Sequence, residues 1–302
     1  MRVPLLAALL TLTASAQAQT QTVEELQRLL RERDAKIREL EKTLTPEDDE
    51  FNRALERTLV QQGALVLPAR TYELEPQVAY AHWDRDRGPF RYEWDASLAL
   101  RAGIGWQSQF QVRVPYVHAA TASDSTTALG DISFSLVKQL GREEGRRPGV
   151  FGALGWVSRT GEDGFSGRVP TGSGFDVAQG ALTAVKRHDP LVYIGGISYS
   201  VPRAREISGV KVDPGNAMGL RGGAVLAATP ETSVNVGLNL GFIGATRIDG
   251  QRVADSDTVL GTLQLGFGTV VSRSAMLNVA GEFRVSGDVP NFRLILGLPI
   301  RF

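Results

Sequence analysis

Charged side chains recur at every second position in several segments of the chain. This spacing puts them on one face of a β-strand. Carboxylate and guanidinium groups on one face of neighbouring strands can line a water-filled pore, set its ion selectivity and hold another segment by ion pairs. We expect such a lumen to be lined by Glu73, Glu75, Glu93, Asp95, Arg101, Arg113, Glu282, Arg284 and Arg293.

The same residues offer no pattern for catalysis. His82, His118 and His188 are far apart and fall on different expected strands or loops, so no metal site is indicated. The chain contains no Cys, and no Ser stands at a recognisable spacing from a base. We therefore expect a protein that is not an enzyme and needs no cofactor. The net charge of zero gives no reason to expect nucleic acid as a partner.

The elements that would position these charges are strands with two unlike faces. Val234, Val236 and Leu238 alternate with Asn235 and Gly237, for example, and similar alternation runs from Arg70 to the end of the chain. Twelve segments fit, an even number, and short and long connections alternate between them, as in single-chain outer-membrane barrels. The sequence therefore predicts an all-β, twelve-stranded antiparallel transmembrane barrel over 70–302. The expected strands lie near 72–80, 92–101, 106–116, 132–136, 149–159, 175–187, 191–202, 216–228, 232–243, 258–270, 275–286 and 291–302.

The last strand, 291–302, ends on Phe302. Its length of 12 residues suits a tilted membrane-crossing strand. A terminal strand of this kind resembles the C-terminal signal that the barrel-assembly machinery reads in bacterial outer-membrane barrels. The alternative is the edge strand of a soluble β-sandwich.

The first 18 residues predict a secretory signal peptide. Arg2 supplies the positive charge, 5–12 forms the apolar core, and Ala16-Gln17-Ala18 forms a cleavage site. Together with the barrel, this indicates the outer membrane of a Gram-negative bacterium, with outer-membrane lipid around the strands.

Residues 19–44 have a different pattern, with apolar residues at heptad spacing and charges between them. This indicates a short periplasmic coiled coil whose a positions leave dimer and trimer open. We expect a homotrimer, because outer-membrane channels often assemble as trimers. A solvated single helix is the alternative, although so short a helix is marginal alone in water. The seam consists of Val23, Leu26, Leu30, Ile37, Leu40 and Leu44.

A second helix is predicted within 45–69, directly before the first strand. Thr45 can cap it, and Pro46 suits its first turn. Because one end is tethered at the first strand, this helix could fold into the barrel mouth as a plug; a spacer or a further coiled-coil segment is the alternative. Its apolar positions are Phe51, Leu55 and Leu59, and its basic positions are Arg53 and Arg57.

Three stretches carry a family resemblance. Leu129-Gly-Asp-Ile-Ser133 and Pro170-Thr-Gly-Ser-Gly-Phe-Asp176 resemble outer-membrane barrels linked to phenol meta-pathway degradation. The order of coiled coil, 56–68 and a strand rich in Glu and Tyr resembles a narrower group, the Fap-type channels that secrete functional amyloid.

This resemblance implies a trimeric channel that exports unfolded amyloid subunits, gated by the helix at about 47–62. Two alternatives stay open. The first is an uptake channel for small hydrophobic or aromatic compounds. The second is a structural barrel that tethers a partner and does not conduct.

Overall fold

The computed structural model describes part of the chain. The described parts are Arg33, residues 46–84 and residues 91–302, without the side chains of 46–53 and of Ser166.

The chain divides into two compact units, residues 1–49 and residues 50–302. In the first unit Arg33 is helical. The predicted signal peptide, and the predicted coiled coil apart from Arg33, lie outside the described residues. None of the described helices has the length and apolar character needed to cross a membrane.

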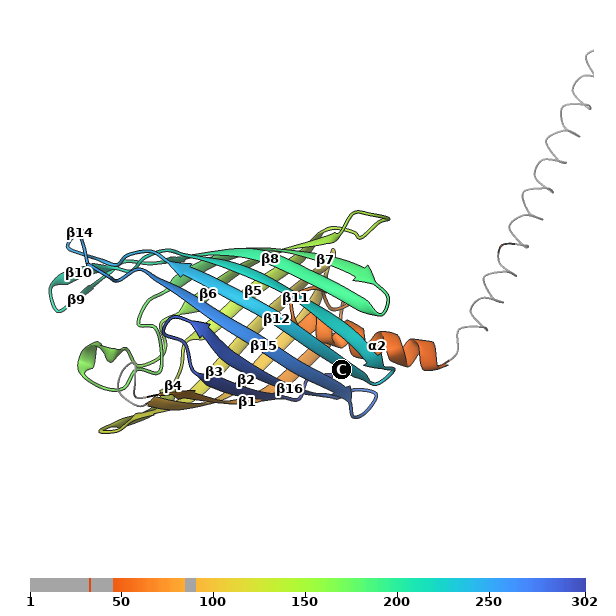
Figure 1. Ribbon diagram of the computed structural model, residues 1–302, viewed down its shortest axis with the longest axis horizontal. Coiled ribbons are helices and arrows are strands. Elements are labelled where there is room, and N and C mark those ends of the chain that lie inside the picture. Colours follow the sequence, from red (N-terminus) through yellow and green to blue (C-terminus); the bar gives the residue numbers. More distant parts are fainter. Residues whose placement is uncertain (1–32, 34–45, 85–90) are drawn as a thin grey trace, which may run out of the picture. The chain divides into compact units, whose positions relative to one another are not determined.

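The second unit is a barrel of twelve long antiparallel strands, as the alternation predicted (Figure 1). Each strand pairs with the next along the chain, and short pieces extend the sheet. The barrel strands are β1 (Tyr72–Trp83), β2 (Arg91–Gly105), β3 (Ser108–Thr121), β5 (Ile132–Gly141), β6 (Gly149–Ser158), β7 (Val177–His188), β8 (Leu191–Pro202), β11 (Ala217–Thr229), β12 (Thr232–Ile243), β15 (Thr258–Val270), β16 (Met276–Ser286) and β17 (Phe292–Gly297).

The first and last strands close the barrel. β1 pairs with β17 from Gln77↔Gly297 to His82↔Phe292, and with the short β18 (Ile300–Arg301) beyond it. The expected strand 291–302 is thus interrupted before Pro299, since proline has no N–H to donate to the ladder. Phe302, at the chain end, still exchanges both backbone hydrogen bonds with Tyr72.

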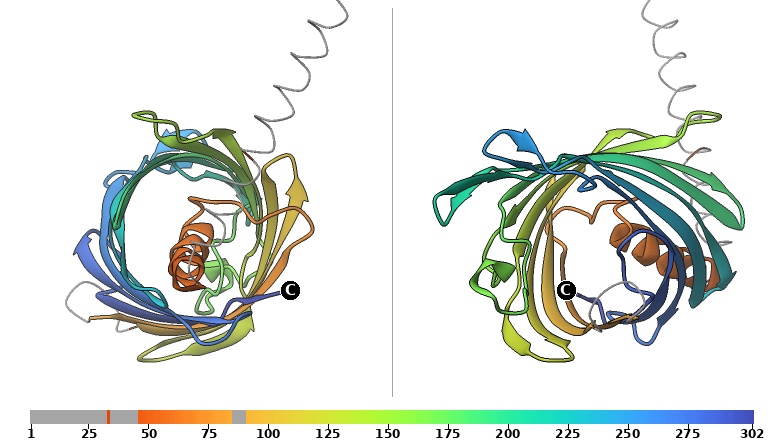
Figure 2. Two further views of the ribbon diagram at one scale, coloured as in Figure 1. Left: turned by 90° about the vertical axis from the view of Figure 1, so that its right-hand side faces the viewer. Right: turned by 60° about the vertical axis from the view of Figure 1, so that its left-hand side comes forward.

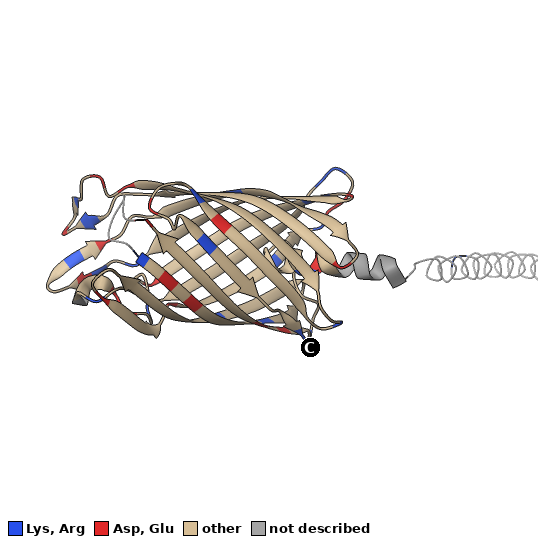
Figure 3. Ribbon diagram, turned by 60° about the horizontal axis from the view of Figure 1, so that its bottom comes forward, with Lys and Arg blue, Asp and Glu red and all other residues tan. Residues whose placement is uncertain are grey.

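The two faces of the barrel differ as the alternation requires. Outward positions carry large apolar side chains that no other part of the described chain covers, among them Trp94, Leu98, Leu154, Ile197 and Leu265. So much exposed apolar surface fits lipid rather than water. Charged residues lie mainly at the two ends and at scattered strand positions, leaving most of the wall free of charge (Figure 3).

The two ends of the barrel differ in their connections. One end, called here the short-turn end, carries tight turns such as 106–107, 189–190 and 230–231, together with both ends of the barrel sequence. The other, called the loop end, carries longer segments, and outer-membrane barrels keep their short turns in the periplasm. The loops hold short elements that were not expected: β4 (Ser125–Leu129), η2 (Gly164–Ser166), β9 (Arg205–Ile207), β10 (Val210–Asp213), β13 (Arg247–Ile248) and β14 (Gln251–Arg252).

Candidate functional site

The helix α2 (Pro46–Gln61) enters the barrel from the short-turn end and lies within the ring of strands (Figure 2). Leu55 and Leu59 are four residues apart and so share one helix face. Leu59 is fully buried, and this face packs on inward side chains from one side of the barrel. The buried cluster comprises Leu59, Ala64, Val137, Phe151, Val185, Val192, Ile194 and Val225.

These contacts make one lumen wall apolar. It is formed by β5, β6, β7, β8 and β11, whose inward positions against α2 are mainly apolar; the exception is Arg221 of β11, which donates to the Thr183 hydroxyl. Burying one leucine side chain is worth about 1.5–3 kcal/mol. Burial of Leu59 against this wall therefore contributes to the free energy that holds α2 in place.

The opposite face of α2 makes polar contacts. The Thr58 and Ser233 hydroxyls lie 2.7 Å apart, both buried, and the Asn278 amide donates to Gln61 Oε1. Arg57 is 4% exposed, and its Nη2 donates to the carbonyl of Arg273 at 2.5 Å. The helix is thus held by apolar packing on one side and by hydrogen bonds on the other.

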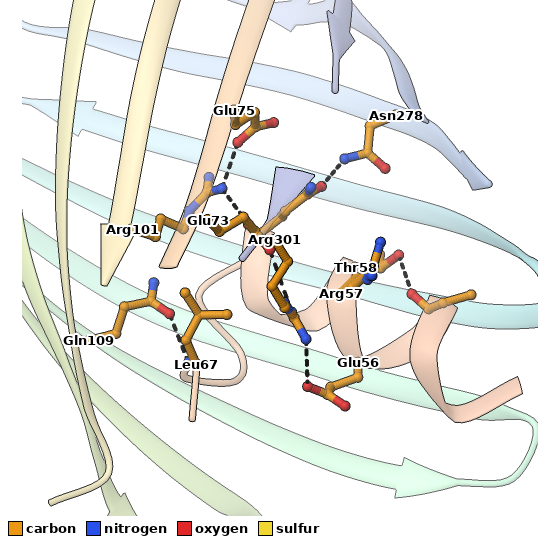
Figure 4. A network of polar contacts seen from close by, with 12 residues as sticks. Glu56, Arg57, Thr58, Leu67, Glu73, Glu75, Arg101, Gln109, Asn278 and Arg301 are labelled. Carbon is orange, nitrogen blue, oxygen red and sulfur yellow. Dashed lines mark hydrogen bonds and ion pairs between the residues drawn. The ribbon is translucent and has the colours of Figure 1, made fainter. Parts of the chain in front are cut away.

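A chain of ion pairs connects α2 to the seam where the barrel closes (Figure 4). Arg301 lies 3.2 Å from Glu56 of the helix and 3.5 Å from Glu73 of β1. Arg101 lies 2.9 Å from Glu73 and 2.7 Å from Glu75. Removing one partner of a buried pair costs about 3–5 kcal/mol because the other charge is left buried, so the Glu73–Arg101 pair is a fixed part of the wall. Glu56 and Arg301 are more exposed than Glu73 and Arg101, so the Glu56–Arg301 pair is the easier of the two to break.

The segment after α2 is fastened along the wall before it becomes β1. Gln109, 1% exposed, accepts a hydrogen bond from the Leu67 backbone N–H at 2.9 Å. A Cβ at Gly103 would collide with the carbonyl of Pro68, so this close approach requires glycine. The tether that links the helix to the first strand is therefore fixed to β2 and β3.

The ion pairs line one side of the lumen, formed by β1, β2, β3 and β17, which is called here the charged wall. Further along this wall, Asp95 lies between two arginines. Arg113 Nη2 donates to Asp95 Oδ2 at 2.7 Å, and Arg293 Nη2 lies 3.6 Å from the same oxygen. Arg113 Nε also donates to the Ser97 hydroxyl at 3.1 Å. The structure thus brings together three of the expected lumen charges from β2, β3 and β17.

The remaining expected residues are more scattered. Glu93 pairs with Arg91 at 2.7 Å. Glu282 stands opposite Arg293 in the strand register, and Arg284 stands opposite Thr262. Phe51 and Arg53 belong to α2, but their side chains lie outside the described residues.

Cavities remain beside the C-terminal end of α2. One of about 320 Å³ lies against the charged wall and is lined by Gln61, Gln77, Arg113 and Arg293 among others. Another of about 290 Å³ lies against the apolar wall, beside Gln62. A third, about 240 Å³, shares Gln61 and Gln62 with the first. The space around the helix end is therefore lined by several charged side chains on one side, and by mainly apolar side chains together with Arg221 on the other.

A second segment enters the lumen from the loop end, the connection 159–176 between β6 and β7 (Figure 2). Val169 packs on Val117 and Ala119, which face inward from β3. Arg91 Nη2 donates to the carbonyl of Pro170 at 3.3 Å. This segment, called here the inward loop, narrows the lumen from the end opposite to the one that α2 enters.

Asp131 fastens the inward loop to the wall. Its Oδ1 accepts from the Gly161 N–H at 3.0 Å, and its Oδ2 accepts from the Ser173 N–H at 2.6 Å and the Ser173 hydroxyl at 2.8 Å. The Thr171 hydroxyl donates to the Leu129 carbonyl at 3.0 Å. The two sequence stretches 129–133 and 170–176 are therefore bonding partners.

Sequence reasoning did not find several of these residues. Ser233, Asn278 and Gln109 act through contacts with segments far away in the chain, and their own neighbourhoods carry no signal. Asp131 lies in the stretch 129–133 that carried a family resemblance, but the sequence did not indicate that Ser173 is its partner. Among the described residues, no group of three or more His, Asp or Glu could hold a metal ion.

Comparison with known proteins shows the fold. The structure superposes on the COG4313 outer membrane channel from Pseudomonas putida F1 with a TM-score of 0.71 and 14% identity, covering 79% of this chain and 97% of that one. The autotransporter NalP translocator domain from Neisseria meningitidis and the NanC porin each give a TM-score of 0.48 and 10% identity; they cover 85% and 75% of this chain, and 96% and 98% of their own. The sequence matches no protein-family model and no curated protein. The fold is that of a bacterial outer-membrane β-barrel.

Proposed function

We propose that this protein is an outer-membrane uptake channel for small hydrophobic or aromatic compounds, and that α2 is its internal gate. The observation that carries the proposal is the position of α2 between two unlike lumen walls, one apolar and one charged. A solute with an apolar body can pass along the same wall that Leu59 covers. The polar contacts on the other side are a few hydrogen bonds and one partly exposed ion pair.

The dimensions beside the helix favour small solutes. The cavities measure about 240, 290 and 320 Å³. The first two are smaller than typical small-molecule sites, which begin at about 300 Å³, and the third is at the lower end of that range. The inward loop 159–176 narrows the path further from the loop end.

Export of unfolded amyloid subunits is the second candidate. The observation that favours it is the order of α2 and barrel, which resembles the Fap-type group. In that case α2 must leave the lumen completely, and residues 19–44 would form a trimeric coiled coil. A cell that makes surface fibres would lose them without this protein.

Current recordings in planar bilayers separate the two candidates. A variant without residues 19–63 should conduct steadily, because it lacks α2. Adding 3-hydroxybenzyl alcohol should then produce brief current blocks, whereas an unfolded peptide of about 40 residues should not enter. Translocation of the peptide, with no effect of the small alcohol, would contradict uptake and favour export. A barrel that does not conduct even without α2 would contradict both.

A further inference from the structure

Arg221 is a cation on the mainly apolar wall that receives α2. It stands in β11, opposite Gly196 of β8 and Asn239 of β12 in the strand register. A Cβ at residue 196 would lie 2.9 Å from Arg221 Nε and 3.2 Å from its Cγ, so the arginine side chain crosses the wall directly over this glycine. Beyond Gly196, its Nη2 donates to the hydroxyl of Thr183 in β7. The glycine therefore lets the side chain lie along the wall.

Two cavities meet at Arg221, beside the C-terminal end of α2. They measure about 290 and 240 Å³, and Gln62, Arg221 and Asn239 line both of them. Among the described residues that line either cavity, Arg221 is the only charged one. The larger cavity is bounded by small apolar side chains such as Ala153 and Ala181, and the smaller one by several amides. A solute in this space would therefore meet one positive charge in neutral surroundings.

The partner that the structure gives Arg221 is neutral. Within the described parts of the chain it donates to the Thr183 hydroxyl and forms no ion pair, whereas Arg101 lies within 3 Å of two carboxylates. A guanidinium has five N–H donors and no acceptor, and Arg221 is only partly buried, so donors remain for a ligand. Because the attraction between charges is stronger away from bulk water, this cation favours an anion in the adjoining cavities.

We infer that Arg221 binds the carboxylate of a small monoanionic solute beside the C-terminal end of α2. The guanidinium N–H groups that Thr183 does not use donate to the carboxylate. The apolar body of the solute lies in the larger cavity, against Ala153 and Ala181. This inference rests on the proposed uptake function and narrows its substrate class to organic acids with one carboxylate. It places the recognition step on the same wall that Leu59 covers.

Isothermal titration of the full chain in a non-ionic detergent tests this site, with benzoate as the probe. The expected result is saturable binding that weakens at least about tenfold in R221Q, since the change removes charge-assisted hydrogen bonds. R221K keeps the charge but not the planar fork, so it should bind more tightly than R221Q and more weakly than the unchanged protein. Thermal unfolding of each variant checks that the barrel is folded.

R284Q is the matched control for the loss of one lumen charge. Arg284 stands in β16, forms no ion pair within the described parts of the chain, and lines neither cavity. R284Q should therefore bind benzoate like the unchanged protein. Equal weakening in R221Q and R284Q would show a general effect of lumen charge and would overturn the inference.

Two related compounds separate the groups of the probe. Acetate carries the charge without the ring and should bind several-fold more weakly, while benzyl alcohol carries the ring without the charge and should show no dependence on Arg221. No saturable binding of benzoate, or equal binding by R221Q and the unchanged protein, would overturn the inference. Equal affinity for acetate and benzoate would overturn the role of the apolar wall. Current blocks by 3-hydroxybenzyl alcohol, which is neutral, test the uptake function separately, so the two can fail independently.

Discussion

Two segments narrow the lumen from opposite ends, and they are held in different ways. The helix α2 is attached to the barrel at one end only and is held by an apolar face and a few polar contacts. The loop 159–176 is attached to strands at both ends and is fastened by Asp131, which accepts three hydrogen bonds.

Under the proposed gating, the difference predicts which segment moves. Releasing α2 breaks contacts that form no part of the barrel ladder, so the wall survives its departure. The loop is also held by side-chain bonds, to Leu129 at the end of β4 and to Asp131 just before β5, but both of its ends continue into barrel strands. We therefore treat α2 as the gate and the loop as a fixed constriction.

The largest effect should come from Leu59→Asp. A carboxylate in the apolar cluster costs several kcal/mol, so α2 should leave the wall and the open time should rise at least about tenfold. Single-channel recording measures this. Gln62→Asp is the matched control, since Gln62 is partly exposed at the end of the same segment and lies outside the cluster. If the L59D channel had the same open time as the unchanged protein, the distinction between α2 as a gate and the loop as a fixed constriction would be wrong.

Asp131→Ala should release the loop without opening the gate. Hydrogen bonds to a charged group contribute about 1.5–3 kcal/mol each, and three are lost. Trypsin should then cut after Arg168 several-fold faster. Asp124→Ala is the control, because Asp124 accepts its bond from the next residue, Ser125. If D131A opened the channel as widely as L59D, the loop would itself be a gate.

Glu56→Gln should have a smaller effect on the helix. The Glu56–Arg301 pair is partly exposed, and such pairs contribute about 0.2–1 kcal/mol. We expect the open time to rise less than about fivefold, and 1 M salt should reduce the difference between E56Q and the unchanged channel. An effect equal to that of L59D would mean that charge, rather than apolar packing, holds α2.

The smallest effect concerns Glu143, in the short turn between β5 and β6. Burial alone would raise the pKa of the Glu143 carboxyl. The Lys186 ammonium and the Arg187 backbone N–H both donate hydrogen bonds to it, and the positive charges of the two side chains also stabilise the carboxylate, so the pKa is lower than usual. Because the pKa is lowered on folding, the carboxylate stabilises the folded state at pH values above the usual carboxyl pKa. This stabilisation is lost as the pH falls through the lowered pKa. Glu143→Gln should therefore lower the melting temperature slightly at pH 7 and less in acid.

The conductance of E143Q should not change, because this turn touches neither constriction. A change in gating, or a melting difference that grows as the pH falls, would contradict this assignment.

The sequence predicted the barrel because a strand has a simple period. Alternation between lipid and lumen is enforced at each position, so twelve segments could be recognised from residues such as Val234 and Asn235 without any partner. The break before Pro299 and the short pieces β9, β10, β13 and β14 were not expected, because they depend on local turns that carry no amphipathic pattern.

The interior was harder to predict. The apolar face of α2 was visible in Leu55 and Leu59, but the wall that receives it comes from five strands. The loop was missed because its fastening joins Asp131 to Ser173, 42 residues away. Contacts of this kind depend on the closed barrel and have no period of their own.

A reversible lock on α2 tests the central claim most directly. The Thr58 and Ser233 hydroxyls are 2.7 Å apart and the chain has no Cys, so T58C combined with S233C can form a single disulfide between helix and wall. In planar bilayers the oxidised pair should stay closed and should open after reduction, while either single variant should not respond to the reductant. Equal conductance of the oxidised and reduced pair would show that α2 does not move to open the channel.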